Sequence, residues 1–228
     1  MKAMILSAGR GSRMGKVSLT KPKPLTMING LTLIENNILR IKESGIYEII
    51  INVSWLGHKI INFLGNGEKY NVKIYYSDEQ DKLLGTGGGV YNALDLLGDD
   101  PFWLINSDIY TSYKIRIDKK IQKNKLCHLV LVPNPRHHLE GDFDLLNNSV
   151  IYNKKKVNNY TFSGISIISP KLFVKRKKSV FALEPILRQA CKKNLASGEV
   201  YNGFWMDIGT QNRLNYLRKK LENSKALI

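Results

Sequence analysis

The chain has 228 residues, 43% of them hydrophobic and 24% charged, and its 35 Lys and Arg against 19 Asp and Glu give a formal net charge of +16. This composition is typical of a globular protein with an apolar core, and it excludes a disordered or repetitive chain. The apolar runs are too short to cross a bilayer and the first residues show no export signal, so we expect a cytoplasmic protein without a membrane partner.

The positive charge is compatible with two kinds of partner, nucleic acids and small polyanionic substrates. The Lys and Arg residues are scattered in short groups, and they are not gathered on one predicted helix face. This distribution argues against nucleic-acid binding. The remaining explanations of the positive charge are small anionic substrates and a simple compositional bias. Cys127 and Cys191 are far apart and have no CxxC partner, so we expect neither a disulfide nor a cysteine metal site.

The first 110 residues alternate between predicted strands and predicted helices. Short apolar runs predict the strands, and apolar residues at helical spacing predict helices, the first of which stops at Gly45. In chain order the segments are a strand at 2–9, a helix at 31–45, a strand at 47–53, a helix at 55–67, a strand at 72–77, a helix at 87–98 and a strand at 101–108. This alternation predicts a parallel α/β sheet.

The second half has more strands than helices. The pattern predicts strands at 125–133, 141–146, 149–153 and 160–168, two short strands within 198–207, and helices at 182–194 and 211–223. These strands would extend the sheet in a mixed or antiparallel manner. We therefore expect one α/β domain over residues 1–228, with a Rossmann-like, mixed but mostly parallel sheet and helices on both faces.

A glycine-rich segment, "LSAGRGSRMGKVSLTKPKPL" at residues 6–25, follows the first strand. In an open α/β sheet this is the edge where ligands bind, and the glycines and basic side chains suit a phosphate. The glycine spacing does not fit a dinucleotide-binding fingerprint, the prolines oppose an immediate helix, and no P-loop string occurs. The remaining alternative is a solvated surface loop.

The strings "SAGRGSRM" and "KPKPL" resemble the signature of the sugar-nucleotidyltransferase family, which transfers a nucleoside monophosphate onto a sugar 1-phosphate and releases pyrophosphate. The resemblance implies the nucleotide-diphospho-sugar transferase fold. It also implies that the loop wraps the triphosphate, that Arg13 contacts the β- and γ-phosphates, and that Lys23 contacts the α-phosphate. The loop residues are Ala8, Gly9, Arg10, Gly11 and Ser12. Family members often carry proline and threonine where this chain has Lys16 and Ser18, and Lys16 has no role in this interpretation.

A second string, "QDKLLGTGGG" at residues 80–89, resembles the family's base-reading segment. The resemblance implies that Gln80 reads the edge of a pyrimidine, which an amide can do because it both donates and accepts. Gly85 would let the backbone approach the ring, and Thr86 follows it. The alternative is a helix start with Thr86 as its N-cap, and the two interpretations are compatible.

Two aspartates follow predicted strands, Asp108 in "LINSD" and Asp207 in "FWMDIGTQNRL". The resemblance implies that both bind Mg²⁺, a hard cation that prefers carboxylate oxygens. Arg13, Lys23 and Asp108 would then be the catalytic residues. The alternative for Asp108 is a turn aspartate. Thr210 is the predicted N-cap of the last helix.

The strings "LVLVPNPRHHLEGDFDL" (129–145) and "YTFSGISIISPKLF" (160–173) resemble the N-acetylmuramate 1-phosphate uridylyltransferases of bacterial cell-wall recycling. The resemblance implies a nucleotide-binding half (1–110) and a sugar-binding half (111–228). The residues that would face the acceptor sugar are Asn106, Gly141, Asp142, Gly164 and Glu184. A metal site that includes His137 and His138 would need a third ligand at useful spacing, and none is evident. We therefore expect both histidines to be loop residues near the sugar. The segment at residues 146–159 is polar and rich in lysine, which predicts a surface hairpin.

These motifs predict Mg²⁺-dependent transfer of UMP from UTP to N-acetylmuramate 1-phosphate by a monomer with small-molecule substrates. Within the class, the alternatives are a glucose 1-phosphate thymidylyltransferase or a mannose 1-phosphate guanylyltransferase. Outside it, the alternative is a protein that binds sugar nucleotides or nucleic acid without turnover. Nucleic-acid binding would not explain Asp108 and Asp207, because carboxylates repel phosphates unless a cation lies between them.

Overall fold

The structure is a computed structural model that describes residues 1–80, 82–153 and 157–225. For Lys16, Val17, Ser224 and Lys225 the side chains are not described, so the unexplained Lys16 lies outside the described side chains. Within the described ranges, no helix combines the length and apolar character needed to cross a bilayer.

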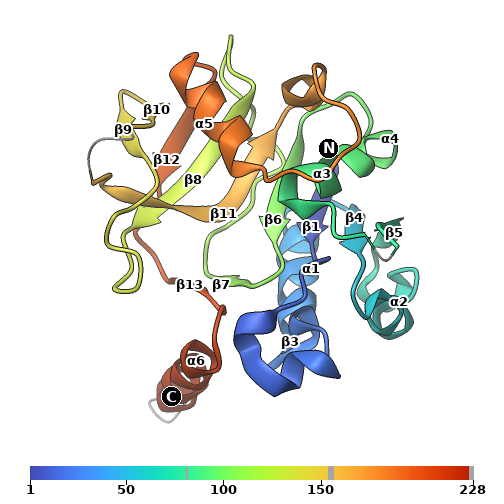
Figure 1. The fold of residues 1–228 in the computed structure, drawn as a ribbon. Helices are drawn as coiled ribbons and strands as arrows, with labels where there is room; N and C mark the ends of the chain where they lie inside the picture. The colour runs from blue at the N-terminus through green and yellow to red at the C-terminus, as the bar shows by residue number, and fades with distance from the viewer. Residues whose placement is uncertain (81, 154–156, 226–228) are drawn as a thin grey trace.

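A nine-stranded sheet forms the centre of the molecule (Figure 1). In spatial order its strands are β5 (Lys73–Asp78), β4 (Glu48–Val53), β1 (Ala3–Leu6), β6 (Phe102–Asn106), β11 (Tyr160–Ile168), β8 (Cys127–Pro133), β12 (Ala196–Val200), β10 (Ser149–Ile151) and β9 (Asp144–Leu146). The first four are mutually parallel, β11 runs antiparallel to both β6 and β8, and β12 is parallel to β8. The predicted mixed, mostly parallel sheet is confirmed.

Helices cover both faces of this sheet, as the sequence predicts. Helices α1 (Leu33–Glu43) and α2 (Gly57–Leu64) pack against one face, and α3 (Gly85–Asn92), α4 (Leu94–Leu97) and α5 (Glu184–Lys192) pack against the other. The central strands are buried on both faces, which explains their continuous apolar runs. Helix α1 starts at a capping box between Thr32 and Glu35, and Gly45 follows it with φ +85°.

A third, smaller core lies beside the sheet, where α6 (Gln211–Lys225) packs (Figure 1). Its members are Met14, Ile28, Leu33, Ile208, Leu214 and Leu217. Two short ribbons accompany it, β7 (Ile109–Thr111) with β13 (Trp205–Asp207), and β2 (Met27–Ile28) with β3 (Leu31–Thr32). The sequence predicts β13 but not β2, β3 or β7, because two or three residues carry no usable periodicity.

Two features of the second half refine the sequence analysis. A hairpin is expected over residues 146–159, but the observed one begins earlier and spans 144–151, where β9 and β10 pair across Asn147 and Asn148, both with positive φ. Part of its expected span, residues 154–156, lies outside the described residues. Cys127 and Cys191 are free and buried, and burial raises the pKa of the Cys191 thiol to about 12.

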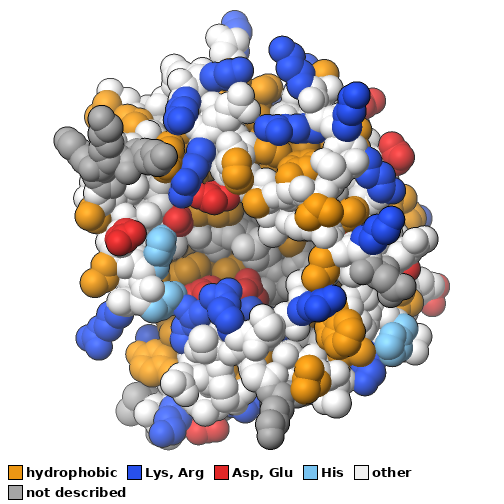
Figure 2. All heavy atoms as spheres, viewed as in Figure 1, with side chains coloured by type: hydrophobic (Ala, Val, Ile, Leu, Met, Phe, Trp, Pro, Cys, Tyr) orange, Lys and Arg blue, Asp and Glu red, His pale blue; other side chains and the backbone are white. Residues whose placement is uncertain are grey.

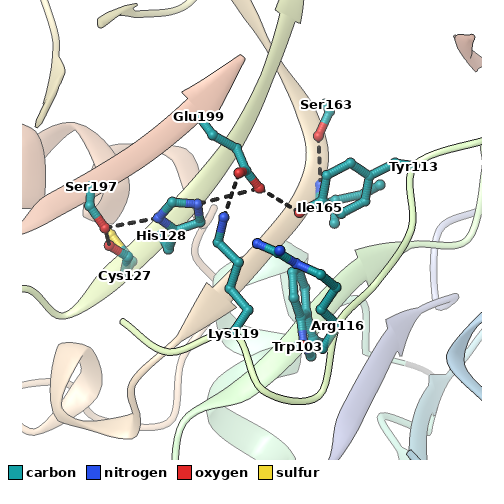
Figure 3. Close-up of polar contacts among 10 residues, drawn as sticks. All are labelled: Trp103, Tyr113, Arg116, Lys119, Cys127, His128, Ser163, Ile165, Ser197 and Glu199. Atoms are coloured by element: carbon teal, nitrogen blue, oxygen red, sulfur yellow. Dashed lines mark hydrogen bonds and ion pairs between the residues drawn. The ribbon is translucent and has the colours of Figure 1, made fainter. Parts of the chain in front are cut away.

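A partly buried polar cluster connects strands β8 and β12 to the long connection that follows β7 (Figure 3). The carboxylate of Glu199 accepts hydrogen bonds from the Tyr113 hydroxyl, at 2.5 Å, and from the Lys119 ammonium. His128 Nε2 lies 3.6 Å from the same carboxylate, and its Nδ1 lies 3.0 Å from Ser197 Oγ. The cluster therefore fixes an otherwise irregular segment to the sheet.

Candidate active site

Two adjoining pockets open at the carboxyl ends of β1 and β6. The chain leaves β1 toward β4 on one side and returns to β6 on the other, which is the arrangement that creates a ligand crevice in open α/β sheets. The first pocket, of about 440 Å³, is lined by residues 6–9, 11–13, 23, 24, 52, 79, 83, 85, 86, 106–108 and 209. The second, of about 570 Å³, is lined by residues 13, 106, 108, 109, 137, 138, 161–164, 205, 207, 210 and 213.

The two pockets are continuous because Arg13, Asn106 and Asp108 line both of them. Figure 2 looks onto this hollowed face, with acidic, basic and histidine side chains around the opening. The structure thus brings together most of the predicted site residues: Ala8, Gly9, Gly11, Ser12, Arg13, Lys23, Gly85, Thr86, Asn106, Asp108, Gly164 and Asp207.

The glycine-rich segment forms an open loop after β1 and then two 3-10 turns, at Ser12–Leu19 and Lys23–Leu25. Gly11 has φ +64°, and a Cβ there would lie 3.0 Å from the Cβ of Lys23. The absence of a side chain therefore lets the loop close over the lysine. No α-helix follows the loop directly, which agrees with the rejection of the dinucleotide fingerprint.

Lys23 and Asp108 meet at the floor of the first pocket. Lys23 Nζ donates to Asp108 Oδ2 at 2.5 Å, and the two side chains are 11% and 23% exposed. This pair joins the end of the glycine-rich segment to the end of β6. The pair also places the Lys23 ammonium where it could contact a phosphate, and the Asp108 carboxylate where it could bind the cation that accompanies a phosphate.

Asp108 and Asp207 both line the second pocket, and Ile208 N donates to Asp108 O at 2.8 Å where the β7–β13 ribbon begins. Asp207 Oδ1 lies 3.1 Å from both Arg213 Nη1 and His137 Nε2. Each carboxylate is thus contacted through one oxygen, that of Asp108 by Lys23 and that of Asp207 by Arg213 and His137. Two carboxylates in one pocket fit Mg²⁺, which usually takes one or two protein carboxylates and completes its shell with water and substrate phosphates. Among the described residues, no group of three His, Cys, Asp or Glu is placed to bind a metal alone.

The base-reading segment is only partly placed as predicted. Gly85 has φ +74° and begins α3, where a Cβ would lie 2.7 Å from Phe181 O. Thr86 is not the N-cap of this helix: it lies inside the first turn, and its Oγ1 accepts from Leu183 N at 2.8 Å. Gln80 is exposed with φ +54°, and it does not line either pocket. Its role in base reading remains a prediction.

Asn52 and Glu79 line the first pocket, although sequence reasoning missed both. Asn52 Oδ1 accepts from Ser7 N at 2.8 Å, Asn52 Nδ2 donates to Glu79 Oε1 at 2.6 Å, and Glu79 Oε2 accepts from Leu84 N at 2.9 Å. Burial raises the pKa of Glu79. The signal that could have identified them is their position, since each lies at the carboxyl end of a parallel strand.

The second pocket has walls from both halves of the chain. Gly164 has φ +77° at a bulge in β11, and a Cβ there would lie 2.7 Å from Asn106 Nδ2. Trp205 Nε1 donates to Ser163 O at 2.9 Å, which joins β13 to the same bulge. The bulge, which the sequence did not predict, brings backbone from β11 next to Asn106.

Several predicted residues do not line the pockets. Asp142 supports the wall instead, since its Oδ2 accepts from Phe162 N at 2.8 Å and its Oδ1 lies 3.0 Å from His138 Nε2. Gly141 precedes it with φ +62°. Arg10 lies over the ring of Trp55 at 5.5 Å. Glu184 is exposed at the start of α5 and pairs with Arg188.

Thr210 caps α6, as predicted, and accepts from Arg213 N at 3.3 Å. His137 and His138 line the second pocket, and their place near the sugar stays a prediction.

Comparisons with known proteins agree with this geometry. A family model described as nucleotidyl transferase matches residues 2–142. The N-acetylmuramate alpha-1-phosphate uridylyltransferase of Neisseria meningitidis is 42% identical over 220 residues, which cover 94% of this chain and 95% of that protein. The mannose-1-phosphate guanyltransferase of Saccharomyces cerevisiae is 28% identical, over 92% of this chain but 61% of its own length.

Solved structures show the same fold. A structure described as a glucose-1-phosphate thymidylyltransferase from Bacillus anthracis has a TM-score of 0.86 at 22% identity, covering 96% of this chain and 94% of that one. HddC from Yersinia pseudotuberculosis has a TM-score of 0.78 at 24% identity, covering 96% of this chain and 99% of that one. The chain therefore belongs to the nucleotidyl transferase family, among the enzymes that act on sugar phosphates.

Proposed function

We propose that this enzyme transfers UMP from UTP to N-acetylmuramate 1-phosphate and releases UDP-N-acetylmuramate and pyrophosphate. The observation that carries the proposal is the 42% identity to an N-acetylmuramate alpha-1-phosphate uridylyltransferase over nearly the whole of both chains. The joined pockets support it, because the reaction needs a nucleotide and a sugar phosphate in contact. The product would return a cell-wall sugar to the cytoplasmic pool of nucleotide sugars, as in peptidoglycan recycling.

The first pocket would hold the nucleotide and the second the sugar phosphate. The first is formed almost entirely by residues of the first 110, with Gly209 as the one contribution from later in the chain among the described lining residues. The second draws most of its lining from residues after 110. This division supports a nucleotide-binding half and a sugar-binding half within one domain.

The chemistry takes place where the two pockets meet. An oxygen of the sugar 1-phosphate attacks the α-phosphorus of UTP, and the bond between the α-phosphorus and the bridging oxygen to the β-phosphate breaks. No general base is needed, because the attacking phosphate oxygen is already an anion at neutral pH. Arg13, which lines both pockets, and Lys23 would stabilise the charge on the phosphates and the pyrophosphate leaving group.

Enzymes of this family generally use divalent metal ions, and we infer that Asp108 and Asp207 would hold Mg²⁺. The ion would neutralise phosphate oxygens as charge develops on them. The protein's own contribution is the spacing: the β7–β13 ribbon holds both carboxylates at one edge of the second pocket. Lys23 would exchange its contact with Asp108 for a contact with phosphate.

A pyrophosphate-release assay tests the proposal with UTP, dTTP, CTP and GTP against the 1-phosphates of N-acetylmuramate, N-acetylglucosamine, glucose and mannose. We expect the highest kcat/KM with UTP and N-acetylmuramate 1-phosphate, and no release when EDTA replaces Mg²⁺. Preference for GTP with mannose 1-phosphate, or for dTTP with glucose 1-phosphate, would instead assign one of the alternative activities. Absence of release with every pair contradicts transferase function.

A further inference from the structure

One cationic group in the second pocket has no task in the reaction described above. Arg213, in the first turn of α6, lines the second pocket but not the first, and its side chain is 16% exposed. The phosphates of the nucleotide and of the acceptor must meet at the junction of the pockets, where Arg13 already lies. Arg213 therefore belongs to the part of the second pocket that the first pocket does not share.

The surrounding turn is shaped to admit the guanidinium. A Cβ on Gly209 would lie 2.0 Å from Arg213 Nη2, so any larger residue at 209 would displace the arginine. Arg213 N bonds to the Thr210 hydroxyl, which fixes the start of the side chain. The glycine of this turn thus serves the placement of Arg213.

The guanidinium retains hydrogen-bonding capacity. Nη1 donates to Asp207 Oδ1 at 3.1 Å, Nε is enclosed without a partner, and Nη2 has no hydrogen bond to the residues that the structure describes. A guanidinium has five N–H donors, and a carboxylate ligand is the group that it binds most specifically. If Asp207 held a divalent cation, the positive charge of Arg213 would be available to another anion.

His137 contacts the same oxygen of Asp207 as Arg213 does. Its Nε2 is 3.1 Å from Asp207 Oδ1, its side chain is 44% exposed, and it lines the second pocket. His138, next to it, is held by Asp142. The rim of the pocket thus adds an imidazole within reach of a ligand that contacts Arg213.

We propose that Arg213, assisted by His137, forms a subsite for a carboxylate on the sugar ring, so that the preferred acceptor is a sugar 1-phosphate with a second acidic group. The inference rests on the proposed function and deepens it. N-acetylmuramate differs from N-acetylglucosamine by a lactyl ether that ends in a carboxylate, so the subsite would separate these two acceptors.

The first test compares kcat/KM for N-acetylmuramate 1-phosphate and N-acetylglucosamine 1-phosphate at saturating UTP. In Arg213→Gln we expect the ratio to fall by about 10- to 100-fold, the effect of losing a charge-assisted hydrogen bond. Arg213→Lys should keep part of the preference. Arg218→Gln should keep all of it, because Arg218 is on the same helix but donates to Met27 O and lines neither pocket. His137→Gln should lower the ratio less than Arg213→Gln.

The ratio of kcat/KM for the two acceptors distinguishes a carboxylate-binding role of Arg213 from a purely structural one. If Arg213 only holds Asp207 in place, Arg213→Gln lowers kcat/KM for both acceptors equally and leaves the ratio unchanged, which overturns the proposal. A wild-type enzyme that uses both acceptors equally well overturns it too.

A second measurement does not depend on turnover and separates failure of the subsite from failure of the proposed function. Saturation-transfer NMR with free N-acetylmuramate, which has the carboxylate but no phosphate, should show binding to wild type with Mg²⁺ present and loss of binding to Arg213→Gln. N-acetylglucosamine serves as the neutral control. Equal signals for the two proteins, or for the two sugars, contradict the subsite even if pyrophosphate release confirms the transferase.

Discussion

The contact between Lys23 and Asp108 sets the state of the site before substrates enter. The two residues are 85 positions apart in sequence, and their 2.5 Å hydrogen bond closes the floor of the first pocket. Each group is kept close to the place where the reaction would use it, the ammonium near phosphate and the carboxylate near a cation. Such preorganisation lowers the reorganisation that the transition state requires.

Substitution Asp108→Asn tests the metal assignment. The amide preserves shape but removes the negative charge, so we expect kcat/KM to fall by about 100-fold or more, as for loss of a main electrostatic group. Pyrophosphate release measures the effect, and circular dichroism checks that the fold is kept. Asp99→Asn, an exposed aspartate outside both pockets, is the matched control. Near-normal activity of Asp108→Asn would remove it from the metal site.

Substitution Gln80→Ala tests base reading. Gln80 is exposed and its backbone lies in the left-handed region, so its side chain would have to turn into the pocket when a nucleotide binds. If it does, Gln80→Ala lowers the kcat/KM ratio of UTP to CTP by about 10-fold, the contribution of one or two hydrogen bonds. An unchanged ratio would contradict the base-reading role of Gln80.

At the scale of elements, a buried chain of hydrogen bonds connects the two loops of the first pocket. It runs from Ser7 N through Asn52 and Glu79 to Leu84 N, and all three side chains, of Ser7, Asn52 and Glu79, are at most 5% exposed. The glycine-rich loop and the start of α3 are therefore held in fixed relative positions. A nucleotide that contacts both loops finds them already aligned.

Substitution Glu79→Ala breaks this bridge. It leaves Asn52 Nδ2 and Leu84 N without their acceptors, which we expect to lower the free energy of unfolding by about 1–3 kcal/mol. The KM for UTP should rise more than the KM for the sugar phosphate, because only the first pocket loses its alignment. Urea unfolding and steady-state kinetics measure the two effects, with Glu43→Ala on exposed α1 surface as control. Equal rises in both KM values would contradict the bridge.

The sequence predicts the long elements and fails where position depends on tertiary contacts. Apolar runs such as the one in β4 identify buried strands, and the family resemblance identifies Arg13, Lys23 and Asp108, which the structure brings together. Neither the apolar pattern nor the resemblance indicates Arg213. Its placement depends on the absence of a side chain at Gly209 and on its contact with Asp207, which are tertiary features. Short strands such as β7 exist only because a distant segment pairs with them.

At the scale of the whole molecule, the partly buried Glu199 cluster joins a lysine, a tyrosine and a histidine away from the pockets (Figure 3). The interaction with His128, together with hydrogen bonds from Lys119 and Tyr113, lowers the pKa of Glu199 despite the opposing effect of burial. The folded protein therefore keeps this carboxylate ionised at a pH where the unfolded chain binds a proton. The stability that it contributes is complete above the unfolded pKa of about 4.3 and is lost as the pH falls toward the lower folded pKa.

Substitution Glu199→Gln should therefore reduce stability at pH 7 by roughly 1–3 kcal/mol and flatten the acid side of the stability profile. Urea unfolding at pH 7, 5 and 3.5 measures both effects. Glu68→Gln, an exposed residue remote from the cluster, is the control. A variant that loses stability in parallel with wild type between pH 5 and 3.5 would show that Glu199 does not contribute to acid sensitivity.

The small third core has a genetic consequence. Leu214 and Leu217 of α6 complete the cluster that packs against Met14 of the glycine-rich segment and Ile208 of the segment bearing Asp207, yet all nine strands of the main sheet are encoded before residue 201. A stop codon at position 211 would therefore leave the main sheet intact while removing the support of both sides of the site. Such an allele would yield a protein that antibodies still detect but that cannot sustain growth where the enzyme is needed.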